Sequence, residues 1–85
     1  IVALISSSVP DKRYPMHYPI PHPSTVAKAA GLQKSSVVKM ETLVTLPKRA
    51  ILRRLGALPR EAIREADSAL AFSLDLPLST PVAGV

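Results

Sequence analysis

Two stretches near the start of the chain have the hydrophobic patterns of β-strands. Residues 1–5 form a continuous apolar run rich in β-branched side chains, which predicts a buried strand. Residues 16–20 are a second candidate, but Pro15, Pro19 and Pro21 flank or interrupt them. Because proline cannot donate to a sheet ladder, we expect this strand to be short or to lie at a sheet edge.

Two further elements are predicted in the middle of the chain. Residues 26–30 favour a short helical turn that Ser24 or Thr25 caps and Gly31 ends. Residues 37–46 alternate between apolar and polar side chains, with extra apolar residues on the polar side. This pattern predicts a strand that is partly buried on both faces, as in a small barrel.

Two helices are predicted in the carboxyl-terminal half. The first covers residues 48–55, and Gly56 is its stop signal. The second runs from Pro59 or Arg60 to about Leu74. The apolar residues expected to be buried are Ile51, Leu52 and Leu55 in the first helix and Ile63, Ala66, Leu70 and Leu74 in the second.

The length of the chain allows one small domain. Of the 85 residues, we assign 1–76 to this domain, and we expect the uncharged tail 77–85 to be disordered because it has no apolar period. The chain has no cysteine, which excludes disulfides and thiolate metal sites. A core this small needs a partner subunit or unusually good packing.

The charge of the chain indicates a polyanionic partner. Eleven Lys and Arg against six Asp and Glu give a net charge of +5. Such a balance suits nucleic acid, and the alternative is a solvated basic face without a partner. Two tyrosines and one phenylalanine are too few for a base-stacking platform, so contacts to RNA would depend on charge, backbone and a few polar side chains.

Metal and membrane signals are weak. His17 and His22 have no carboxylate or third imidazole close by in the sequence, so we expect neither a metal nor another cofactor. No apolar run approaches the roughly 20 residues of a membrane span.

Three passages follow one another along the chain in a characteristic order. The first, IVALISSSVPDKRYP, is an apolar strand that ends in Ser, followed by a loop and Pro. The second, GLQKSSVVKMETLVTLPK, holds a Ser-Val strand and the start of the next helix, and the third, LGALPREAIREADSALAFSL, holds a Gly-x-Leu turn and a terminal helix. In this order the three passages resemble the MazF/PemK-type toxins of type II toxin–antitoxin systems.

This resemblance implies an α+β fold, a small SH3-like β-barrel with two C-terminal helices. It also implies a cytoplasmic endoribonuclease, an mRNA interferase that works as a homodimer on single-stranded RNA and that a cognate antitoxin blocks. In such enzymes a ribose 2′-hydroxyl attacks the adjacent phosphate without a metal. Since the chain opens without Met inside an apolar run, we expect it to lack the family's amino-terminal hairpin and to hold an incomplete barrel.

The resemblance assigns roles to four residues. Ser6 falls on the family's catalytic Thr/Ser position, although Ser6 to Ser8 can instead bond the turn. Lys12 and Arg13 are expected to bind phosphates, or else to form a solvated turn. Glu41 matches a position that reads RNA bases, and its alternative is an outward-facing strand residue paired with a lysine.

The family's catalytic arginine has no counterpart in residues 1–85, which leaves other functions open. One alternative is a non-catalytic remnant that keeps a dimerising or antitoxin-binding surface. Another is a basic binding module, with residues 48–74 as a helix-turn-helix for DNA. Its second helix, however, places alanines where base-reading polar side chains are wanted.

Overall fold

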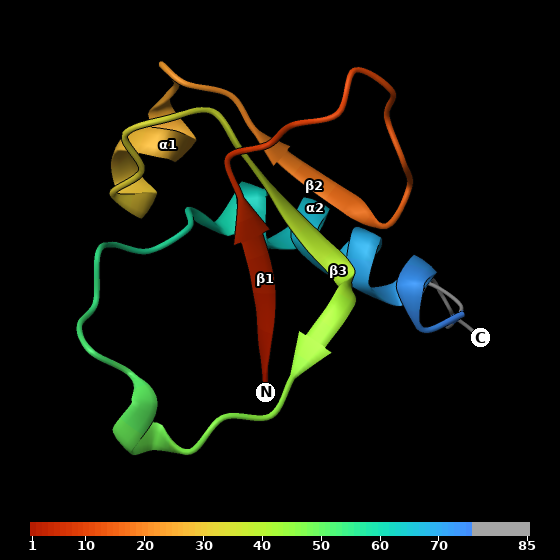
Figure 1. Ribbon diagram of the computed structural model, residues 1–85. Helices are drawn as coiled ribbons and strands as arrows, with labels where there is room; N and C mark the ends of the chain where they lie inside the picture. Colours follow the sequence, from red (N-terminus) through yellow and green to blue (C-terminus); the bar gives the residue numbers. More distant parts are fainter. Residues whose placement is uncertain (76–85) are drawn as a thin grey trace.

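The computed structural model describes residues 1–75, and the expectation of a disordered tail at 77–85 lies outside them. The described chain holds a three-stranded antiparallel sheet and a carboxyl-terminal helix (Figure 1). This arrangement confirms the α+β class. None of the described helices is long and apolar enough to cross a membrane.

The sheet consists of β1 (Val2–Ser6), β2 (His17–Ile20) and β3 (Ser36–Val44), in the spatial order β1-β3-β2. The prediction of an edge position for the proline-containing strand is therefore confirmed. The strand predicted at residues 1–5 forms, but the prediction that it is buried is wrong. β1 is the other edge, and Leu4 and Ile5 are about half exposed because α2 (Arg60–Ser73) packs against β2 and β3.

The core lies between the sheet and α2. Tyr18 pairs with Val38 across β2 and β3, so both side chains point to the same face of the sheet. This face packs against a stripe of small residues on α2, which lets the helix approach closely. The buried members of the cluster are Tyr18, Ile20, Ala27, Val38, Met40, Ala62, Ala66 and Ala69.

Helix α2 forms where it was predicted, but it is rotated relative to the predicted stripe. Ile63 and Leu74 are 46% and 49% exposed, whereas Ala66 is buried and Leu70 packs partly against the core. The helix is held at its end by Ser73, whose Oγ donates to the carbonyl of Met40 at 2.7 Å. Small alanines face the sheet, so the larger side chains lie at the flanks of the contact.

Helix α1 (Thr25–Ala30) forms as the capping signals predicted. Ser24 Oγ accepts a hydrogen bond from the backbone N–H of Ala27 at 3.0 Å. Gly31 ends the helix with a φ of 75°, a conformation that other residues adopt at a cost. There is also a steric reason for glycine at this position. A Cβ added at Gly31 would lie 2.3 Å from the carbonyl oxygen of Leu55.

The helix predicted at 48–55 is wrong. A single 3-10 turn, Lys48–Ala50, is followed by irregular chain that swings away from the sheet (Figure 1). Its apolar residues Ile51 and Leu52 stay exposed, so no buried face stabilises a two-turn helix. Without this helix the helix-turn-helix interpretation fails as well.

Candidate functional site

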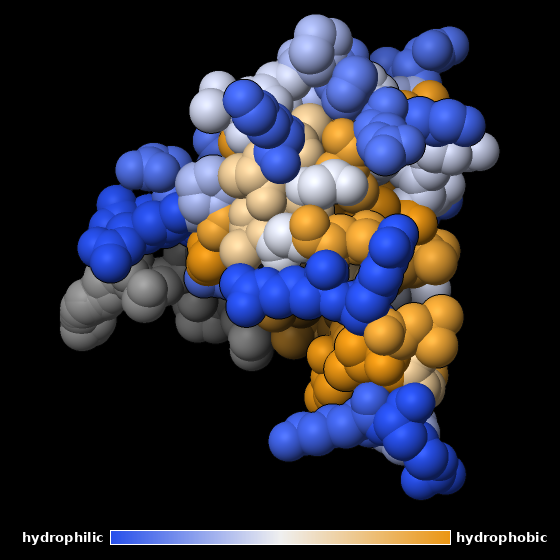
Figure 2. Space-filling view, turned by 90° about the vertical axis from the view of Figure 1, so that its left-hand side faces the viewer, coloured by the Kyte–Doolittle hydropathy of each residue, from blue (hydrophilic) through white to orange (hydrophobic). Residues whose placement is uncertain are grey.

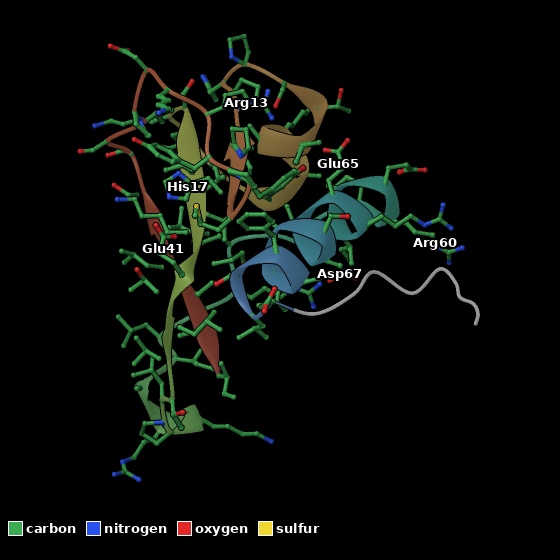
Figure 3. All side chains as sticks on the ribbon, turned by 90° about the vertical axis from the view of Figure 1, so that its right-hand side faces the viewer. Arg13, His17, Glu41, Arg60, Glu65 and Asp67 are labelled. Atoms are coloured by element: carbon green, nitrogen blue, oxygen red, sulfur yellow. The ribbon has the colours of Figure 1, made fainter. Side chains whose placement is uncertain are left out.

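The candidate site lies on the face of the sheet opposite α2. Ser6 of β1 pairs with Val37 of β3, and His17 of β2 pairs with Lys39 of β3. Since side chains alternate between faces, these residues and Glu41 share one side. Figure 3 shows His17 and Glu41 on this side, away from α2.

The loop between β1 and β2, residues 7–16, covers part of this face. Val9, Pro10 and Tyr14 of the loop line a cavity of about 110 Å³ together with Val37. Val37 is only 2% exposed although it points away from the main core. The loop therefore forms a second, smaller apolar layer that brings Lys12 and Arg13 to the site.

His17 and Glu41 form the single ion pair found between residues 1 and 75. His17 Nε2 lies 2.8 Å from Glu41 Oε2, and the two side chains are 10% and 44% exposed. The hydrogen bond from His17 lowers the pKa of Glu41, with smaller help from nearby Lys39. An ionised Glu41 needs a proton on His17 Nε2, which leaves Nδ1 as the lone-pair nitrogen of a neutral ring. Nδ1 is buried and has no hydrogen-bond partner within the described chain.

Aromatic and cationic contacts connect this pair to the loop. The rings of Tyr14 and His17 meet edge to face with centroids 5.1 Å apart. Lys12 Nζ lies 5.8 Å from the centroid of the Tyr14 ring, within the range of a cation–π contact. A chain of contacts thus runs from Lys12 through Tyr14 and His17 to Glu41.

Ser6 lies at the end of β1 on the same face. Its Oγ accepts a hydrogen bond from the backbone N–H of Ser8 at 3.1 Å, as the turn interpretation expects. The hydroxyl proton of Ser6 is not used in this bond, so it can still be donated to an external acceptor.

Arg13 is exposed and lines two larger cavities of about 760 and 510 Å³ at the β2 edge. Glu65 of α2 lines both cavities as well. Burial, and then the charge of Glu65, raise the pKa of Tyr18, which lines the smaller of the two.

A second basic area lies on the segment that follows β3. Lys48, Arg49, Arg53 and Arg54 are all exposed on the irregular segment 45–59. Figure 2 shows the face that carries this segment, with apolar surface between blue hydrophilic side chains. These four residues therefore form a solvated basic surface.

Three residues singled out from the sequence lie near two that were not, and the roles assigned to them stay predictions. Lys12, Arg13 and Glu41 are brought together around His17 and Tyr14, which had no assigned role. His17 and Glu41 are 24 positions apart in the sequence, which explains the omission, because only the pairing of β2 with β3 makes them neighbours. Within residues 1–75, no group of three His, Cys, Asp or Glu is placed to hold a metal ion.

The comparisons with known proteins agree with the fold and with the three sequence passages. The sequence model of the PemK-like, MazF-like toxin of type II toxin-antitoxin systems matches residues 1–74. Among solved structures, the toxin MazF-mt6 of Mycobacterium tuberculosis superposes with a TM-score of 0.72 at 23% identity, covering 88% of this chain and 68% of that one. No curated protein sequence matches the chain.

At 23% identity the structural match shows the fold alone. The family match is independent of it and spans almost the whole described chain. The protein therefore belongs to the PemK-like, MazF-like toxin family of type II toxin-antitoxin systems.

Proposed function

We propose that this chain is an endoribonuclease toxin that cuts single-stranded RNA and is inhibited by a cognate antitoxin. The family match over residues 1–74 carries the proposal. The net charge of +5 supports an RNA substrate, because neutralised phosphates release counterions and so favour binding.

The proposed reaction is an attack by a ribose 2′-hydroxyl on the adjacent phosphate. The new 2′-oxygen–phosphorus bond forms as the bond to the 5′-oxygen breaks, which leaves a 2′,3′-cyclic phosphate and a 5′-hydroxyl. One proton must leave the attacking oxygen and one must reach the leaving oxygen, while charge on the phosphate is stabilised.

The loop and β1 supply the phosphate contacts in this proposal. Ser6 donates its free hydroxyl proton to a non-bridging phosphate oxygen while the N–H of Ser8 fixes its Oγ. Lys12 and Arg13 bind neighbouring phosphates, because both are exposed cations on the loop beside this face. They position the RNA strand rather than read its sequence.

Glu41 is the proposed contact to a base. Its carboxylate stays ionised because its pKa is lowered, and Oε2 is held by His17 Nε2. Oε1 remains available to accept from an exocyclic amino group such as cytosine N4. His17 is thus a positioning residue, and its own contact with Tyr14 fixes the ring.

Exposed apolar residues support a homodimer as the active form. Leu4, Ile5 and Val44 of the β1–β3 region are 46–50% exposed, although each is a large apolar side chain. Surfaces of this kind mark interaction sites in soluble proteins. Light scattering after gel filtration tests the dimer directly, with a mass of 9.1 kDa expected for a monomer.

The decisive experiment is cleavage of end-labelled single-stranded RNA by the purified chain in EDTA. We expect cuts at a defined short sequence and products with a 5′-hydroxyl, detected by direct labelling with polynucleotide kinase. An RNA with a 2′-deoxy sugar at the cut site should resist cleavage. Ser6→Ala should reduce the rate by about tenfold or more, whereas the exposed control Ser7→Ala should not.

A non-catalytic RNA-binding module is the second candidate. The hydrogen bond from Ser8 N–H to Ser6 Oγ favours it, because it gives Ser6 a structural role in the turn. Binding of RNA without any cut, unaltered in Ser6→Ala, would support this candidate and contradict the nuclease.

A further inference from the structure

A cleft at the β2 edge adjoins the face that carries Ser6 and Glu41 and shares Arg13, Tyr14 and His17 with the candidate site. It has a volume of about 760 Å³, and its walls come from residues 13–17 on one side and α2 on the other. The residues that line it are Arg13, Tyr14, Pro15, His17, Glu65, Ser68, Ala69 and Phe72. A single nucleotide fits comfortably in a space of this size.

The two walls of the cleft carry side chains of opposite charge. Arg13 comes from the loop and Glu65 from α2, and both also line the adjoining 510 Å³ cavity. Figure 3 shows them at the same end of the molecule. Neither belongs to the one ion pair of residues 1–75, so each charge is available to a ligand. A ligand that matches both carries an anionic group and a hydrogen-bond donor.

The sequence has three Tyr and Phe residues, and two of them line the same cleft. Tyr14 is 39% exposed and Phe72 is 55% exposed, so each offers part of a ring to solvent. A flat ring system that stacks on such surfaces loses little entropy and gains contact area. The aromatic rings, the cation and the carboxylate match the base, the phosphate and an amino group of a nucleotide.

We propose that this cleft binds one nucleotide of the RNA strand, with its phosphate at Arg13 and its base against Phe72 and Tyr14. Glu65 then accepts a hydrogen bond from an exocyclic amino group of the base. Uracil lacks an exocyclic amino group and offers only its ring N3–H as a donor, so the proposed contact favours a base with an amino group, such as cytosine or adenine, over uracil. This proposal rests on the proposed function in one respect, which is that the nucleotide belongs to an RNA strand.

The test is titration of the ¹⁵N-labelled chain with CMP, with UMP and with inorganic phosphate, followed by backbone amide shifts. We expect CMP to shift Tyr14, Ser68 and Phe72 and to bind about tenfold more tightly than UMP. Phosphate alone should shift only the neighbourhood of Arg13. A short RNA should shift the same amides as CMP if the strand supplies the nucleotide.

Matched variants separate the three contacts. Phe72→Ala and Arg13→Gln should each weaken CMP binding by about tenfold. Leu74→Ala and Arg60→Gln are the controls, since both residues are exposed and outside the cleft. Glu65→Gln should remove the preference for CMP over UMP, whereas Glu61→Gln, one turn earlier on α2, should keep it.

Several results would overturn the proposal. Equal binding of CMP, UMP and phosphate would show an anion site without base recognition. Shifts confined to residues near Ser6 and Glu41 would place the nucleotide elsewhere. RNA cutting that is unchanged in Phe72→Ala and Glu65→Gln, with no CMP binding, would leave the nuclease intact and refute the cleft. CMP binding without RNA cutting would instead support the cleft and contradict the proposed nuclease.

Discussion

Helix α2 and the segment 45–59 both carry apolar residues at helical spacing, but they end in opposite states. Ala62, Ala66 and Ala69 of α2 are at most 6% exposed against the sheet. Leu52 of the segment is 95% exposed, and no helix forms there beyond one 3-10 turn. Helical spacing yields a stable helix only where a second surface is present to bury the apolar side.

What holds the segment is backbone contact with α1. The N–H of Ala57 donates to the carbonyl of Ala29 at 2.9 Å. A Cβ added at Gly56 would lie 2.3 Å from the same carbonyl oxygen. One region is therefore stabilised by apolar burial and the other by a close approach that only glycine permits.

The largest difference is expected between truncating an apolar residue of the core against which α2 packs and truncating one of segment 45–59. Ile20→Ala should lower the free energy of unfolding by about 2–5 kcal/mol, because Ile20 is 1% exposed and its removal leaves a cavity. Leu52→Ala should change it by less than about 0.5 kcal/mol. Urea denaturation followed by circular dichroism measures both, and similar losses would show that the segment is buried.

The glycine contact predicts the next largest effect. Gly31→Ala should cost about 2 kcal/mol or more, since φ is 75° and the new Cβ meets the carbonyl of Leu55. This corresponds to a loss of about 10 °C in melting temperature for a domain of this size. Gly56→Ala adds a clash with Ala29, whereas exposed Gln33→Ala is a neutral control. An unchanged melting temperature in both glycine variants would mean that segment 45–59 does not pack against α1.

A smaller effect is expected where α2 is fastened to β3. Ser73→Ala removes the 2.7 Å hydrogen bond to the carbonyl of Met40 and should cost about 1 kcal/mol. Ser68→Ala is its control, because the Ser68 hydroxyl only bonds back to the carbonyl of Arg64 one turn earlier. Equal losses in the two variants would assign the effect to helix propensity instead of the link to the sheet.

The same contrast explains how much was predictable from the sequence. Local signals found the strands, the caps of α1 at Ser24 and Gly31, and the extent of α2. They missed the rotation of α2 and the state of segment 45–59, because both depend on which surface is available to pack. In the site, family likeness pointed to Glu41, but its partner His17 follows only from strand pairing.

The smallest effect is expected at the His17–Glu41 pair, which links β2 to β3 by a hydrogen bond to an exposed carboxylate rather than by apolar burial. The pKa of Glu41 is lowered in the folded chain by the hydrogen bond from His17, so this stabilisation is present above the unfolded pKa and is lost as pH falls through the folded one. Because Glu41 is 44% exposed, we expect only about 0.2–1 kcal/mol.

Glu41→Gln should therefore lower stability slightly at about pH 7 and flatten its dependence on pH in the acidic range. Urea denaturation from about pH 3 to about pH 7 would show this, because ordinary side-chain carboxylates titrate near about pH 4. Asp67→Asn removes the same charge from the exposed side of α2 and should leave that dependence in place. If Glu41→Gln and Asp67→Asn give the same profile, the pair contributes nothing to folding. Its 2.8 Å hydrogen bond would then serve only to orient the carboxylate toward a ligand.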